Sequence, residues 1–264
     1  NSGTGGELVL SAGTSTFATG TGGQLTISSG AGSTSSSGNL LLLTSNAGTA
    51  GVSGTIALST GAATDGNSGG LYIGSGAGVK GRAGHVYVNA GTGNSGTGAE
   101  LVLRGGITSF GASGGKVSIV SGSNSAGHSS GALLMSTADG GATGVSGIIA
   151  LSTGTSGSGN TGAIYIGSGA ATGGRAGAVY LAGGSGNTGV GGELLLHGGT
   201  SSTVTKGTGG KLIISSGQGT KSTSGALVLR TATAGTNGLS GMIILSTGDA
   251  TSGNSGGIYI GSGL

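Results

Sequence analysis

Apolar and polar residues alternate in short blocks that recur along the whole chain. Each block begins with a glycine (Ala99 in one copy), followed by five residues that we number positions 1 to 5 of the repeat. Positions 2 and 4 are apolar in every copy, as in residues 6–11, GELVLS. This period of two is typical of an extended strand with one buried face. The repeat occurs seventeen times, at intervals of 15 to 18 residues.

The stretches between the blocks are rich in Gly, Ser, Thr and Ala with occasional Asn or Asp, which favours turns. One strand and one turn per repeat predict an all-β fold. We expect a single parallel β-solenoid of about 17 rungs of 15–18 residues, with a flattened or small triangular cross-section. Hairpin strands do not explain why the same glycine precedes every block. A polyproline-II bundle would need glycine at every third residue, which the pattern lacks.

This fold predicts two internal ladders of apolar side chains, one from position 2 and one from position 4. Neighbouring rungs would lie about 4.8 Å apart, so that each ladder is continuous. The residues that we expect in this core are Leu8, Leu10, Leu25, Ile27, Leu101, Leu103, Leu194 and Leu196.

A longer period groups the repeats in sixes. Position 1 is glutamate at residues 7, 100 and 193, and position 3 follows a matching order in each group. We therefore predict one domain over residues 1–264, built from super-repeats 1–93, 94–186 and 187–264, the last of them incomplete. Six rungs would give an axial repeat of about 29 Å. We expect these residues to belong to a longer array or to stack end to end.

Position 3 should point outward, yet it is aliphatic or tyrosine in thirteen of the seventeen repeats. A continuous apolar stripe on a surface indicates an interface, although the strand propensity of such residues also accounts for it. The residues of this candidate lateral interface are Val9, Leu41, Tyr72, Tyr87, Leu134, Tyr165, Tyr180 and Tyr259. Two pairs at position 1 of adjacent repeats, Glu100–Lys116 and Glu193–Lys211, are candidate ion pairs that fix the register.

Composition narrows the possible chemistry. The 264 residues include 70 glycines and no cysteine or proline, so a disulfide framework, a thiolate metal site and collagen are excluded. The net charge of +3 comes from few, scattered residues and gives no basic stripe for nucleic acid. No stretch is long and apolar enough to predict a membrane span.

The sequence gives no sign of a catalytic, cofactor or metal site. Its six acidic residues and three histidines are scattered, and the glutamates lie six repeats apart. Catalysis needs acids, bases or nucleophiles that converge, and metal binding needs characteristic ligand spacing. We therefore expect a protein that is not an enzyme and has no cofactor.

The repeats over residues 54–61, 147–154 and 241–248 resemble the Gly/Ser/Thr-rich tandem repeats of microbial and algal surface proteins. That family includes adhesin-like β-solenoids and the shafts of cell-surface hairs. The resemblance implies an extracellular, fibrous and non-enzymatic role. We expect a structural filament or stalk that is extracellular or lies at the surface of a cell or virion.

We expect the partners to be copies of the same chain, or other filament proteins or glycans, without nucleic acid and without membrane insertion. The alternatives are an ice- or surface-binding solenoid and the stalk of a viral or bacterial adhesin. An ice-binding face would need a regular Thr-x-Thr array, which positions 1, 3 and 5 do not provide.

Overall fold

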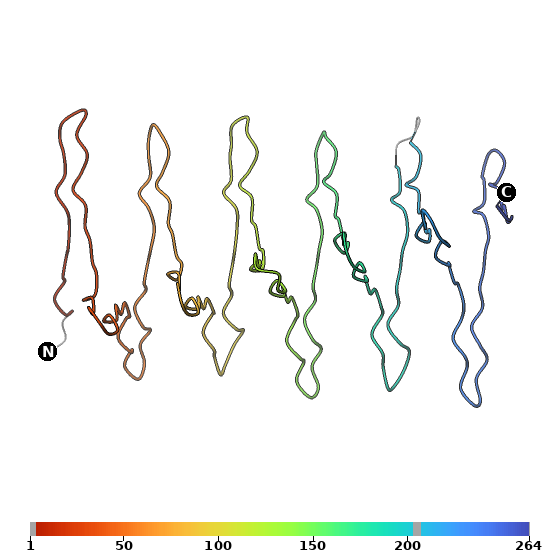
Figure 1. The fold of residues 1–264 in the computed structure, drawn as a ribbon, viewed down its shortest axis with the longest axis horizontal. Helices are drawn as coiled ribbons and strands as arrows, with labels where there is room; N and C mark the ends of the chain where they lie inside the picture. Colours follow the sequence, from red (N-terminus) through yellow and green to blue (C-terminus); the bar gives the residue numbers. More distant parts are fainter. Residues whose placement is uncertain (1–3, 203–206, 264) are drawn as a thin grey trace. The chain divides into compact units, whose positions relative to one another are not determined.

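The computed structural model of the chain describes residues 4–202 and 207–263. These residues contain no helix and no β-strand. The backbone follows an irregular path that doubles back in a succession of narrow loops (Figure 1). The predicted all-β fold, a single parallel β-solenoid, is therefore wrong, and the described residues form an irregular coil.

The hydrogen bonds of the backbone explain the difference. A parallel solenoid needs a ladder of hydrogen bonds between the five-residue blocks of consecutive repeats. Over the described ranges there are eleven backbone–backbone hydrogen bonds. Seven of them join residues that flank the stretches between blocks, and four close tight turns within those stretches. A folded chain makes about one hydrogen bond per residue, and roughly two-thirds of these are between backbone groups. The blocks are therefore not paired with one another.

Seven of these bonds close the loops in the same way. We number the two residues after each block positions 6 and 7. The N–H of the glycine that begins a repeat donates to the carbonyl oxygen of the glycine at position 7 of the preceding repeat. The donor–acceptor pairs are Gly23–Gly13, Gly38–Gly30, Gly115–Gly106, Gly131–Gly122, Gly192–Gly184, Gly210–Gly199 and Gly225–Gly217, with distances of 2.7 to 2.9 Å. Each bond brings the start of one block beside the end of the block before it.

Equivalent positions of the super-repeats have the same local backbone structure. Tight turns are closed by hydrogen bonds from Gly51 to Gly48, from Gly144 to Gly141 and from Gly238 to Gly235. Gly96 and Gly189, which are equivalent in sequence, have φ angles of 77° and 84°. This left-handed region is costly for residues with a Cβ, so glycine is required there.

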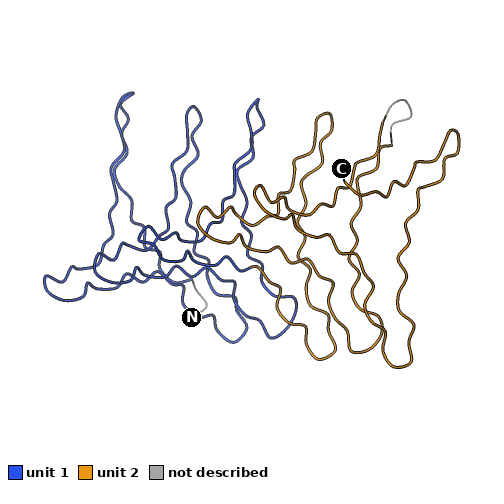
Figure 2. Cartoon of the chain, turned by 45° about the vertical axis from the view of Figure 1, so that its right-hand side comes forward, with its two compact units in different colours: residues 1–134 blue, residues 135–264 orange. Residues whose placement is uncertain are grey.

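The chain divides into two compact units, Asn1–Leu134 and Met135–Leu264, shown in blue and orange in Figure 2. The boundary between them falls inside a repeat, between positions 3 and 4. It does not coincide with either boundary between super-repeats.

The described side chains form no buried core. Apart from Leu8, position-2 residues are 49–55% exposed, whereas the position-3 tyrosines are 84–95% exposed. In the blocks that contain tyrosine, the alternation is thus visible as a difference in exposure between positions 2 and 3. The accessible surface of 26051 Å² is more than double the roughly 10,000 Å² expected for a folded monomer of this mass.

Candidate functional site

The glycine that begins a repeat lies very close to the preceding repeat. A Cβ at Gly115 would lie 2.6 Å from the backbone nitrogen of Gly106, and one at Gly192 would lie 2.8 Å from that of Gly184. Position 6 of the preceding repeat is itself glycine in both cases, Gly105 and Gly183. Neither Gly115 nor Gly192 has a positive φ. Close approach of two backbones, and not backbone conformation, therefore requires glycine at these two positions.

The contact is looser where position 6 carries a side chain. A Cβ at Gly54 or Gly147 would lie 3.2 Å from the Cγ2 methyl group of Thr44 or Thr137. At Gly69 the corresponding distance, to Thr60, is 3.6 Å, an ordinary van der Waals contact. The closure of the loops is therefore tightest at the positions where glycine faces glycine.

The structure does not bring the expected core residues together in a dry interior. Leu8, Leu10 and Ile27 are 83%, 64% and 56% exposed, and the others are also more than half exposed: Leu25, Leu101, Leu103, Leu194 and Leu196. The hydrogen bonds between successive repeats join glycines outside positions 2 and 4, and the expected core side chains remain more than half exposed.

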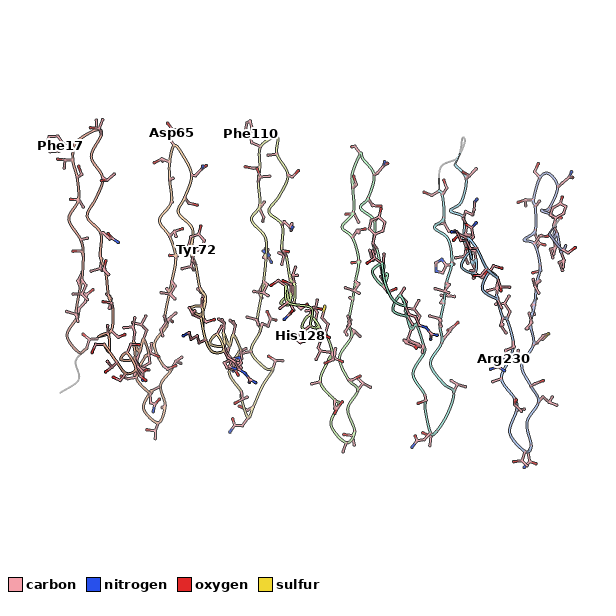
Figure 3. All side chains as sticks on the ribbon, viewed as in Figure 1. Phe17, Asp65, Tyr72, Phe110, His128 and Arg230 are labelled. Atoms are coloured by element: carbon pink, nitrogen blue, oxygen red, sulfur yellow. The ribbon has the colours of Figure 1, made fainter. Side chains whose placement is uncertain are left out.

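The residues of the candidate lateral interface are all well exposed, and its tyrosines and Leu134 are among the most exposed apolar side chains. Tyr72, Tyr165 and Tyr259 are 94–95% exposed, and Leu134 is 88% exposed. The other residues of this candidate interface are 68–90% exposed: Tyr180, Tyr87, Leu41 and Val9. Figure 3 shows how side chains project from the ribbon, with Tyr72 labelled. These residues form an apolar stripe along the sequence that the chain leaves open, and we call it the position-3 stripe.

Glycine at position 1 leaves room for a position-3 ring. A Cβ at Gly70 would lie 3.0 Å from Cε2 of Tyr72, and one at Gly257 would lie 2.9 Å from Cε2 of Tyr259. Tyr87 instead has His85 at position 1, and the two rings lie 5.6 Å apart with planes tilted by 46°.

The candidate ion pairs do not form in the part of the chain that the structure describes. No contact between opposite charges joins Glu100 to Lys116 or Glu193 to Lys211. These pairs were expected because a solenoid would place position 1 of adjacent repeats side by side, and the observed loops do not.

The histidines and carboxylates stay apart. His197 Nδ1 lies 3.3 Å from the carbonyl oxygen of Gly198, and the backbone N–H of His128 donates to Asn124 Oδ1 at 3.0 Å. Among residues 4–202 and 207–263 there is no group of three metal-ligating side chains and no pocket. No helix that could cross a membrane occurs in the same ranges.

Sequence reasoning missed two aromatic residues at the tips of loops. Phe17 and Phe110 lie 93 residues apart, and Figure 3 labels both at loop tips. Their backbone N–H groups donate to Ser15 Oγ at 3.4 Å and to Thr108 Oγ1 at 3.5 Å. A Ser or Thr two residues before an aromatic residue is the signal that could have identified these turns.

Comparison with known proteins adds no relative: no family model, no curated protein and no solved structure matches the chain.

Proposed function

We propose that the chain is a repeat segment of an extracellular filament, fibre or stalk, a structural protein that assembles with copies of itself and not an enzyme. The observation that carries this proposal is the exposed position-3 stripe, which recurs in all three super-repeats. The extracellular location rests on the resemblance to surface-protein repeats.

The energetics of exposed apolar surface support association. Burial of apolar surface contributes about 25 cal/mol per Å², and complete burial of a Leu or Val side chain contributes roughly 1.5–3 kcal/mol. Leu41, Leu134 and Ile213 are 69–88% exposed in the single chain, so most of this energy remains available to a partner. Exposed apolar side chains that recur at the same position of each repeat offer a partner a regular series of contacts.

The repetition favours a partner of the same kind. Position 3 follows a matching order in each super-repeat, so each super-repeat of one copy presents a similar surface to another copy. A net charge of +3 over 264 residues opposes close packing of identical chains only weakly. A chain with many equivalent contact points can associate along its length as well as end to end.

Electron microscopy of negatively stained, purified protein over a series of concentrations tests the proposal. We expect fibres whose number and length increase with concentration. Sedimentation of the same samples should move protein from a slow species into a fast one. Short, monodisperse particles at every concentration would contradict the proposed function.

A further inference from the structure

All five tyrosines occupy one kind of position. Tyr72, Tyr87, Tyr165, Tyr180 and Tyr259 each stand at position 3 of a repeat, and the sequence has no other tyrosine. Their exposed fractions of 84–95% place them among the most exposed residues of the blocks. The first four form two pairs on adjacent repeats, separated by 15 residues within each pair.

Most of the neighbours of these rings within a block are small residues. Positions 1, 3 and 5 of an extended block share a face. At four of the five tyrosines, positions 1 and 5 are glycine or alanine, as in Gly70 and Gly74 around Tyr72. In the described structure no hydrogen bond engages the phenolic oxygen of any of these tyrosines. With 84–95% of each tyrosine exposed, the rings are accessible to a second ring, although Cε2 of Tyr72 and of Tyr259 lies against the position-1 glycine of its own block.

The composition leaves few competing sites for oxidation. The chain has no cysteine and no tryptophan, and its only methionines are Met135 and Met242. Copies of this chain cannot be joined by disulfides. Tyrosine is then the residue type through which a one-electron oxidant could join two copies covalently.

We propose that the position-3 tyrosines are sites of oxidative cross-linking, at which two copies of the chain become joined through dityrosine. This inference rests on the proposed function, because self-assembly would bring position-3 residues of different copies together. The oxidant would be hydrogen peroxide acting with a haem peroxidase.

The formation of dityrosine is a two-electron oxidation of two phenols. Each of two phenols gives up one hydrogen atom, as an electron and a proton, and becomes a phenoxyl radical. The two radicals join through ring carbons adjacent to the oxygen, forming one carbon–carbon bond. Each joined carbon then releases its hydrogen as a proton, and each oxygen regains one, which restores both aromatic rings. One hydrogen peroxide takes up the two electrons and two protons and is reduced to two water molecules.

The test uses filaments assembled from equal amounts of ¹⁵N-labelled and unlabelled chain. After treatment with peroxidase and hydrogen peroxide, denaturing electrophoresis detects covalent oligomers, and mass spectrometry identifies the joined peptides. We expect oligomers with dityrosine fluorescence, in which position-3 peptides of different isotopic composition are joined.

Two variants separate the role of the phenol from that of the ring. The variant with all five substitutions, Y72F/Y87F/Y165F/Y180F/Y259F, keeps the apolar stripe, so it should assemble normally and give no covalent oligomers. Adding Phe17→Tyr to this variant places one tyrosine at a loop tip that is 82% exposed. Because this tip lies outside the position-3 stripe, the added tyrosine should not restore cross-linking.

Three results would overturn the inference. Wild-type filaments could give no cross-links, or cross-links only between peptides of the same copy. The variant with tyrosine at residue 17 could give covalent oligomers in the same yield as wild type. Each of them leaves the proposed filament role intact. A failure of wild-type chains to assemble at any concentration would instead contradict the proposed function, and the inference with it. If the phenylalanine variant does not assemble, the isotope pattern of the cross-linked peptides from wild-type filaments still shows whether position-3 tyrosines of different copies are joined.

Discussion

At the scale of single residues, the environment of the glycine that begins a repeat differs from one repeat to another. Gly115 and Gly131 both donate to the carbonyl oxygen of the preceding position-7 glycine, at 2.8 and 2.9 Å. A Cβ at Gly115 would lie 2.6 Å from the nitrogen of Gly106, whereas one at Gly131 would lie 3.8 Å from that of Gly122. The same substitution should therefore have different effects at the two positions.

We expect Gly115→Ala to break its loop-closing hydrogen bond and Gly131→Ala to retain it. Such a bond contributes about 1 kcal/mol. The protection of the amide proton at residue 115, measured against the exchange rate of an unstructured chain, should therefore fall about fivefold in the variant relative to wild type. Hydrogen exchange followed by NMR measures this change, and Gly131→Ala is the matched control. Equal effects at the two positions would show that the close approach at Gly115 does not determine the loop.

At the scale of the repeat, the sequence predicted the alternation of exposure but not the arrangement of the blocks. Leu133 at position 2 is 53% exposed and Leu134 at position 3 is 88% exposed, as expected for neighbours on opposite faces. The solenoid prediction further assumed that the next repeat covers position 2. A period of two shows that a face is apolar but does not show which part of the molecule covers it.

For the candidate site, the sequence predicted the residues at each position but not the contacts between repeats. The order of residues at position 3, including all five tyrosines, was readable from the sequence. The absence of an ion pair between Glu100 and Lys116 could not be predicted, because it depends on how adjacent repeats are placed. The close contact of Gly115 with Gly106 also required coordinates. The sequence shows that position 6 of the preceding repeat is Gly105 in one case and Ser121 before Gly131, but only the structure shows that this position meets the first glycine of the next repeat.

The position-3 stripe leads to a prediction at this scale. Leu134→Ser removes an apolar side chain from the stripe, and Leu239→Ser removes the same side chain beside the Gly235–Gly238 turn, where it is 99% exposed. If Leu134 becomes buried between copies, its loss should raise the critical concentration for assembly about tenfold to a hundredfold. Leu239→Ser should have little effect. Sedimentation over a concentration series measures both, and equal effects would argue against the stripe as the interface.

At the scale of the whole molecule, the described side chains form no buried core, and the chain exposes 26051 Å². A cooperative unfolding transition requires a large apolar surface that is buried together and released together, which also produces the increase in heat capacity. We therefore expect dilute chains to show no heat-absorption peak in differential scanning calorimetry. The proposed assembly would supply the missing burial, so concentrated samples should show a peak.

The concentration dependence of that peak distinguishes burial between copies from burial within one copy. Association stabilises the bound state by mass action, so the peak temperature should increase with protein concentration. The Leu134→Ser variant should show a lower peak temperature than wild type at the same concentration, because it buries less apolar surface between copies. A sharp transition that persists on dilution, at an unchanged temperature, would mean that a single chain buries its own apolar residues. In that case the exposed stripe could not be the driving force for assembly.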